Sequence, residues 1–278
     1  MKKRKNKLII ILIIVFALIF LAVAGYIVFR IINSAAADQE YDEIASSYAS
    51  DISRTEPSTE KKQQTTTAKT SDEPESSDTT STVKNPVKVP ELEEKNEDIY
   101  AWINIPNTNV NYPVAQSGAD DNFYLDHDIH KNYSFPGTIY SQSCNKKDFS
   151  DRVTVLYGHN MLDGSMFATL HNFSDPDFFE DNKYIYIFTE NRKLTYEVVS
   201  AFIYDDRHIM NSFNFTDDAV YAQWQKEVLN PRSVSSNVRK DVKLNKDDKM
   251  LVLSTCLNGG GDGRYLVQGV LVNNEQTG

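Results

Sequence analysis

The chain has 278 residues and a formal net charge of −10 at pH 7. Outside the N-terminal tail it has no basic patch, which argues against a nucleic-acid-binding protein. Only two cysteines occur, Cys144 and Cys256, whereas an outward-facing domain stapled by disulfides usually carries more. Two interpretations follow: the cysteines form a single bridge, or at least one thiol is kept free for chemistry.

The N-terminus joins a basic tail, residues 1–7, to an uncharged apolar run over residues 8–29. As a helix this run is about 33 Å long, enough to cross the hydrocarbon core of a bilayer. We therefore expect a single-pass membrane anchor over residues 8–30, with the tail in the cytoplasm and the rest of the chain outside. A signal peptide cleaved near residues 34–37 is the alternative, but the apolar run is longer than a signal h-region of roughly 7–15 residues.

Residues 31–89 are polar, rich in Ser and Thr, and nearly free of large apolar side chains. Such a segment cannot bury enough surface to offset the entropy lost on ordering. We expect a disordered stalk here, with a weak helical pattern over residues 35–53. A protein that starts near Pro90 is therefore expected to fold and to act on peptides without the preceding residues.

The predicted catalytic domain, residues 90–278, contains many short runs rich in Val, Ile and Tyr and bounded by turn residues. A short helix is expected from residue 91. Predicted strands cover residues 102–105, 110–114, 137–140, 153–157, 184–188, 194–204, 250–255 and 265–272. Helical patterns fit residues 165–172 and 218–229. Many short strands with few helices predict a mainly β fold, a closed or nearly closed β-barrel with peripheral helices.

A β-rich run ends on Cys256, and a glycine-rich loop over residues 258–263 leads to a second apolar strand that Arg264 opens. Two strands joined by one short loop form an antiparallel pair, which brings Cys256 and Arg264 to the same end. A nearby cation lowers the pKa of a thiol, and the arginine fork can donate hydrogen bonds to an oxyanion. Taken one at a time, these features also fit a core cysteine, a turn and a solvated arginine.

The strand predicted over residues 153–157 runs into a loop that carries His159 directly after Gly158. A cysteine nucleophile in acyl transfer needs a partner that protonates the leaving amine, and histidine suits that role near neutral pH. The other histidines are weaker candidates for this role. His127 and His130 lie in a polar loop, His171 lies on a predicted helix, and His208 lies close to two acidic residues. A metal site in the polar loop, formed by Asp126, His127, Asp128 and His130, is an alternative, but its spacing fits no known ligand pattern.

The run Leu253-Ser254-Thr255-Cys256 resembles the TLxTC signature of sortases, and Arg264 falls where the sortase arginine falls. Residues 157–161 and 163–167 resemble the histidine loop of class B sortases. Residues 121–125 resemble a class B segment near the substrate groove, and the insertion between residues 204 and 249 is similar to a long class B connection. Two departures occur: Leu253 replaces Ser or Thr in the signature, and Leu257 after the cysteine removes any polar contact that relatives make there.

The resemblance implies an eight-stranded sortase barrel and a class B cysteine transpeptidase that needs no cofactor or metal. Cys256 would attack a C-terminal sorting motif on a secreted protein and form a thioester, with His159 as acid and base and Arg264 on the motif and the oxyanion. The implied substrate-binding residues are Asn122, Tyr157, Ser254 and Thr255. The implied acceptor is an amino group of a cell-wall precursor or a pilin lysine.

Two other classes stay open from the residues alone. A secreted cysteine protease or amidase would use the same Cys256–His159 pair with water as the acceptor. A non-enzymatic anchored adhesin would need no reactive thiol.

Overall fold

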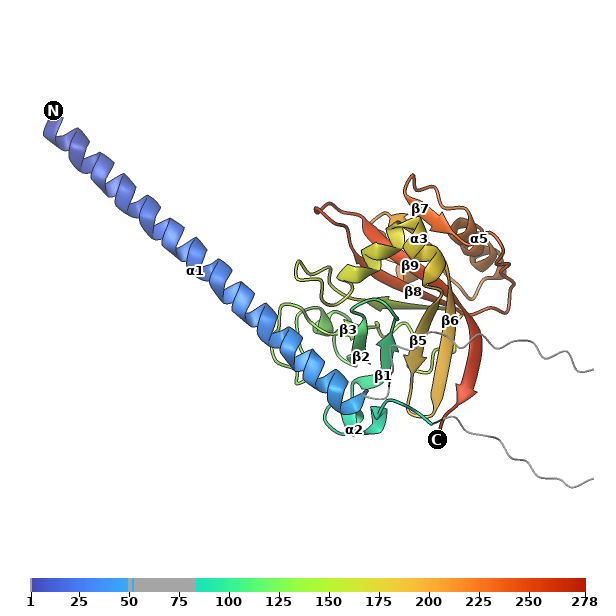
Figure 1. The fold of residues 1–278 in the computed structure, drawn as a ribbon. Coiled ribbons are helices and arrows are strands. Elements are labelled where there is room, and N and C mark those ends of the chain that lie inside the picture. The colour runs from blue at the N-terminus through green and yellow to red at the C-terminus, as the bar shows by residue number, and fades with distance from the viewer. Residues whose placement is uncertain (1, 50–51, 53–83) are drawn as a thin grey trace, which may run out of the picture.

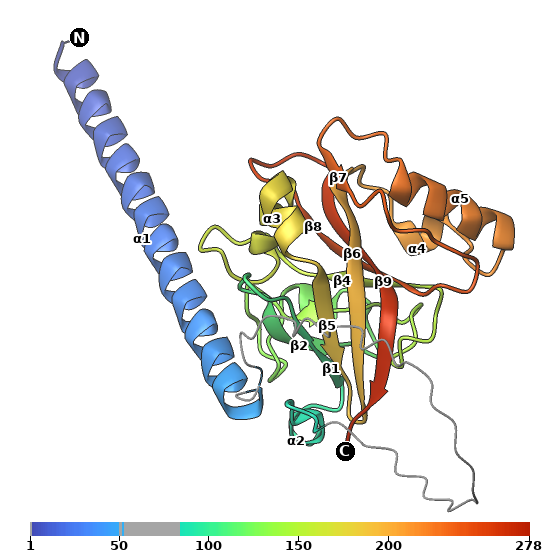
Figure 2. The ribbon, with the colours of Figure 1, turned by 45° about the vertical axis from the view of Figure 1, so that its right-hand side comes forward.

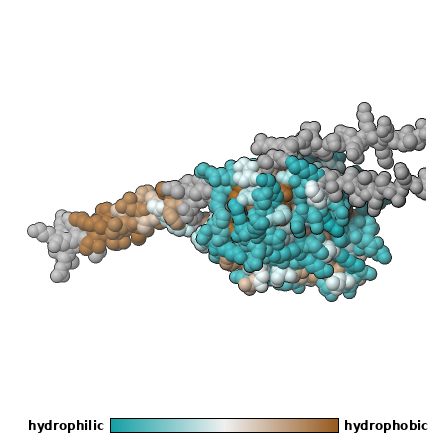
Figure 3. Space-filling model, turned by 90° about the horizontal axis from the view of Figure 1, so that it is seen from below, coloured by the Kyte–Doolittle hydropathy of each residue, from teal (hydrophilic) through white to brown (hydrophobic). Residues whose placement is uncertain are grey.

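The computed structural model describes residues 2–49, 52 and 84–278. Helix α1, Lys2–Tyr48, is one continuous element of 47 residues that projects from the rest of the molecule (Figures 1 and 2). Its segment Ile10–Phe29, with a mean hydropathy of 3.1, is long and apolar enough to cross a membrane. Figure 3 shows this segment as an apolar rod beside a largely hydrophilic domain.

Eight strands of the described residues close into a barrel, in the order β5-β1-β2-β3-β4-β8-β9-β6, with β6 pairing back onto β5. All of these pairs are antiparallel except β2–β3 and β4–β8. The predicted eight-stranded barrel is therefore confirmed. The strands are β1 (Ile99–Asn104), β2 (Asn111–Ala115), β3 (Ile139–Tyr140), β4 (Val153–Tyr157), β5 (Tyr184–Phe188), β6 (Arg192–Tyr204), β8 (Met250–Cys256) and β9 (Arg264–Gln276).

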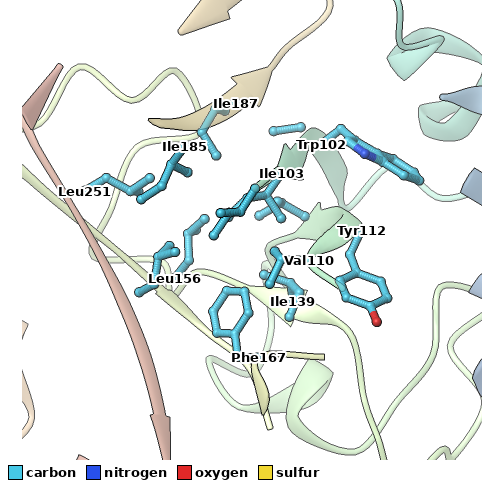
Figure 4. Packing of buried hydrophobic residues seen from close by; sticks show 14 of the residues in the cluster. Trp102, Ile103, Val110, Tyr112, Ile139, Leu156, Phe167, Ile185, Ile187 and Leu251 are labelled. Carbon is cyan, nitrogen blue, oxygen red and sulfur yellow. The ribbon is translucent and has the colours of Figure 1, made fainter. Parts of the chain in front are cut away.

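The barrel holds one core inside and a second one on its outer face. Inside, Figure 4 shows Ile103, Leu156, Ile185 and Leu251 from four different strands pointing toward one another. Each of these side chains is inaccessible to solvent. Because neighbouring residues of a strand point to opposite faces, the strands of such a barrel supply both cores at once.

The outer core lies under helix α5, Asp218–Leu229, which covers β6, β8 and β9 (Figure 2). Asp217 caps the helix by accepting from the backbone N–H groups of Ala219 and Val220. Trp224 and Val228 on its inner face are buried. The helix predicted over residues 218–229 is confirmed, whereas two short elements of the same insertion were not predicted: α4 (Ile209–Ser212) and β7 (Ser236–Val238), which pairs on β6 outside the barrel.

The described residues form four further short helices, of which α2 precedes β1 and the other three lie between strands. The helix expected from residue 91 is α2, and the helix expected over residues 165–172 is a 3₁₀ helix, η2, shifted toward the C-terminus. Their bounds are α2 (Val89–Glu93), η1 (Phe123–Leu125), η2 (Ala168–Ser174) and α3 (Pro176–Asp181).

The first part of the expected stalk differs from the prediction. Helix α1 continues to Tyr48, and Tyr41 and Ile44 are buried against the barrel with exposures of 3% and 8%. Two apolar side chains three positions apart on a helix form one face, which suffices for docking in an otherwise polar sequence. The N–H of Lys88 donates to the Tyr48 carbonyl at 2.9 Å. The residue that ends α1 and the residue just before α2 are therefore in direct contact. Residues 53–83 lie outside the described part, and a disordered stalk there stays a prediction.

Candidate active site

Strands β4 and β8 run parallel and end at the same edge of the barrel. Their register pairs Val153 with Met250 and Tyr157 with Ser254. The histidine two residues beyond Tyr157 and the cysteine two residues beyond Ser254 therefore lie at neighbouring strand ends. Gly158 permits this turn, because a Cβ there would lie 2.5 Å from Ile139 Cδ1 and 2.8 Å from the Phe167 ring.

Cys256 and Arg264 face each other across the first pair of the β8–β9 hairpin. Residues directly opposite in an antiparallel pair have Cβ atoms about 4.5–5.5 Å apart. Cys256 is exposed and Arg264 is half-buried. Arg264 Nη1 donates to the carbonyls of Asp262 at 3.1 Å and Gly263 at 3.0 Å, which holds the guanidinium at the mouth of the loop. Cys256 and Arg264 thus lie at the same end of the hairpin, as predicted.

His159 is held by the segment that follows β2. Its Nε2 lies 2.8 Å from the carbonyl oxygen of Leu125, and the Phe135 ring stacks on the imidazole with centroids 5.5 Å apart. These two contacts fix the ring in position and plane. Neither Leu125 nor Phe135 was assigned a role from the sequence, because each lies more than 20 residues from His159 in the chain.

One pocket of about 270 Å³ brings the three predicted catalytic residues together. Cys256, His159 and Arg264 line it, and so do all four residues expected to bind substrate: Asn122, Tyr157, Ser254 and Thr255. Burial raises the pKa of Tyr140, also in the lining, to about 12, and the nearby Arg264 partly offsets this. Tyr140 therefore contributes a neutral phenol to a lining that also contains Asp206, Arg207 and Arg264.

Three polar side chains of the pocket lining, Asn122, Gln142 and His208, are joined by hydrogen bonds. Of these, only Asn122 was expected at the site. Gln142 donates from Nε2 to Asn122 Oδ1 at 3.2 Å, and its Oε1 lies 2.5 Å from His208 Nε2. His208 begins α4 as its N-cap, accepting from the N–H of Asn211. The insertion between β6 and β8 is thereby joined to the segment after β2. No sequence signal links these residues, because they are at least 20 positions apart.

Two side chains converge on the carbonyl oxygen of Cys256. His171 Nε2 lies 2.9 Å from it, and Asn160 donates to it from Nδ2 at 3.2 Å. The His171 ring stacks on Tyr265, the residue after Arg264, with centroids 4.6 Å apart. Burial lowers the pKa of His171, and its contact with Cys256 partly offsets this. The sequence placed His171 only on a predicted helix, so this contact was missed.

The remaining thiol and loop histidines have other surroundings. Cys144 is not bonded to Cys256, and burial followed by the charge of Asp121 raises the pKa of its thiol. His127 stacks on Phe123 at 4.0 Å, while His130 pairs with Glu40 of α1 at 2.8 Å. Among the described residues no group of three potential ligands is placed to hold a metal ion.

Comparison with known proteins agrees with this arrangement. The sortase domain model matches residues 103–272. Sortase B of Listeria monocytogenes is 33% identical over 189 residues, which cover 66% of this chain and 73% of that protein. The crystal structure of Clostridium perfringens sortase B matches with a TM-score of 0.60 and 32% identity, covering 66% of this chain and 99% of that one.

A further solved structure is Spy0129, described as a Streptococcus pyogenes class B sortase involved in pilus biogenesis. It is 25% identical, with a TM-score of 0.57, and the match covers 67% of this chain and 98% of that one. The match to the domain model spans the barrel from β1 to β9 and includes Cys256, His159 and Arg264. The chain therefore belongs to the sortase family of cysteine transpeptidases, and its relatives place it in class B.

Proposed function

We propose that Cys256 is the nucleophile, His159 the acid and base, and Arg264 the oxyanion-binding residue of this transpeptidase. The observation that carries the proposal is the direct pairing of Cys256 with Arg264 in one pocket with His159. A guanidinium across the hairpin supplies directed hydrogen-bond donors beside the reacting carbonyl.

In the first half of the reaction, Cys256 Sγ attacks the carbonyl carbon of a peptide bond in the sorting motif. The carbonyl oxygen becomes negative, and the Arg264 guanidinium donates to it. The C–N bond then breaks, and His159 gives its proton to the leaving amine. The product is a thioester on Cys256.

In the second half, an amine attacks the thioester carbon and loses a proton to His159. The C–S bond breaks and Cys256 leaves as a thiolate, so the proton and the charges balance over the cycle. We place the sorting motif in the pocket along Asn122, Tyr157, Ser254 and Thr255, which line it next to the thiol. The acceptor is an amino group of a cell-wall precursor or a pilin lysine; the similar class B sortase Spy0129 is involved in pilus biogenesis.

The enzyme acts at the cell surface as a membrane-anchored protein. The apolar segment Ile10–Phe29 of α1 supports the anchor. The basic residues before it place the N-terminus in the cytoplasm by the positive-inside rule, with the barrel outside. Protease added to intact cells should remove the barrel and leave the N-terminal tail protected.

Mass spectrometry tests the chemistry. A peptide library is incubated with the full-length protein, with and without triglycine or a lysine-containing peptide as amine. We expect a thioester adduct on Cys256 that the amine resolves into a transfer product. The matched variants are Cys256→Ala, expected to lose the adduct, and Cys144→Ala, expected to keep it. Products that contain only hydrolysed peptide at saturating amine would instead support a protease or amidase.

A further inference from the structure

The end of helix α1 is built into the catalytic domain by a buried tyrosine. Tyr41 donates from its hydroxyl to the carbonyl of Gly137 at 2.7 Å and lies 3.0 Å from the Thr138 hydroxyl. Its ring packs edge-on against Tyr112 of β2, with centroids 5.4 Å apart. Burial raises the pKa of Tyr41 far above its usual range, so the hydroxyl keeps its proton as a donor.

The two residues that the Tyr41 hydroxyl contacts belong to the segment that begins with η1 and ends before β3, which we call the 123–138 loop. Gly137 has φ +63°, and a Cβ on it would lie 2.4 Å from Tyr124 O and 2.5 Å from Leu125 O. The N–H of Thr138 donates to Tyr124 O at 2.9 Å. The two ends of the loop are therefore packed backbone to backbone, and a shift at Gly137 moves Leu125.

The other side of the same loop holds the proposed acid and base. Leu125 supplies the carbonyl that lies 2.8 Å from His159 Nε2, and Phe135 supplies the ring that stacks on the imidazole. The 123–138 loop thus lies between the end of α1 and His159. A second contact between α1 and the loop is the pair of Glu40 with His130 at 2.8 Å, although it is partly exposed and contributes little.

We propose that Tyr41 is a positioning residue for His159, acting through the 123–138 loop, so that one side chain of the membrane helix helps to align the catalytic site. This inference rests on the role of His159 proposed above. It replaces the expectation that every residue before Pro90 is dispensable for chemistry. The membrane helix then does more than tether the enzyme, because its docked end keeps the acid and base aligned.

The test uses Tyr41→Phe in the full-length protein, purified in detergent micelles. This variant distinguishes an effect of the hydroxyl contacts on the position of His159 from an effect of ring packing. Phenylalanine keeps the ring against Tyr112 and removes the two hydroxyl contacts. Transfer is followed with a quenched-fluorescent peptide chosen from the library and triglycine as amine. We expect kcat to fall roughly 3- to 30-fold, a fraction of the roughly 10²–10⁴-fold that a general acid contributes. KM for the peptide should stay within about twofold, because the Tyr41 hydroxyl contacts lie in the 123–138 loop, whereas nearly all of the pocket lining comes from other segments.

Tyr48→Phe is the matched control, since Tyr48 packs on the same face of the domain and its ring lies 4.9 Å from Lys95 Nζ. It should keep the kcat of the unsubstituted protein. Nitrogen-15 spectra of histidine-labelled protein provide a second readout, and the His159 ring signals should shift in Tyr41→Phe but not in Tyr48→Phe.

Each outcome decides one claim. Normal kcat and unshifted His159 signals in Tyr41→Phe, with His159→Ala inactive, would overturn the inference and leave the proposed function intact. Equal losses of kcat in both tyrosine variants would also overturn it, because they would indicate general loosening. Full activity of His159→Ala would overturn the proposed function itself.

Discussion

Arg264→Lys tests whether the cation opposite Cys256 acts by charge alone or by directed hydrogen bonds. Arg264 is half-buried, and its Nη1 is already engaged by the carbonyls of Asp262 and Gly263. The other guanidinium nitrogens supply further N–H donors fixed in the same plane. A lysine ammonium that satisfied the same two carbonyls would be drawn into the loop and away from the reacting carbonyl.

The expected magnitude follows from the loss of one oxyanion donor. Removing such a donor costs on the order of 10²–10³-fold in rate, about 3–4 kcal/mol of transition-state stabilisation. Lysine preserves the positive charge, so the pH dependence of Cys256 alkylation should barely move. Turnover of the peptide and the rate of iodoacetamide alkylation as a function of pH are measured on the same preparations.

Two results would refute this reasoning. Unchanged turnover in Arg264→Lys would remove the residue from the active site and leave it a solvated strand-end arginine. A fall in turnover that follows a raised thiol pKa would show that Arg264 tunes the nucleophile. A large loss of turnover at an unchanged thiol pKa is the outcome that directed hydrogen bonding requires.

Three further changes have defined outcomes. His159→Ala should slow thioester formation by roughly 10²–10⁴-fold, measured by rapid-quench mass spectrometry, and near-normal rates would contradict an acid role. Burial lowers the pKa of His171 in the native state. Below about pH 6.5 the unfolded chain therefore binds more protons at this residue than the native protein does. The free energy of unfolding falls as the pH falls through this range. His171→Gln should therefore flatten the decline in Tm between pH 7 and 5, and an unchanged slope would argue against this. Trp224→Ala empties a site that is 1% exposed under α5 and should cost about 3–5 kcal/mol in urea unfolding, whereas a loss below about 1 kcal/mol would mean that α5 is not part of the core.

Helices and strands were predicted correctly where the local pattern of apolar and turn residues matches the segment that is buried in the structure. β4, β5 and α5 begin and end where the sequence places them, because turn residues bound their apolar runs on both sides. β7 was missed because its sequence, Ser236–Val238, is short and polar, and it forms only by pairing with β6. α3 was missed as well, although Asp175 as N-cap and Pro176 at the first position are a helix-start signal.

The sequence by itself pointed to Cys256, His159 and Arg264 as candidate catalytic residues and to an apolar segment long enough to cross a membrane. Cys256 and Arg264 are joined by a short loop, and the residues around them carry the motif that resembles sortases, so local information was sufficient. Only the tertiary structure showed which residues contact His159 and that Tyr41, near the end of α1, packs into the catalytic domain. Leu125 and Phe135 contact His159, and Tyr41 contacts the 123–138 loop, only because segments far apart in the chain pack together. Such contacts leave no local pattern, since each residue keeps an ordinary sequence environment and becomes functional only when the barrel closes.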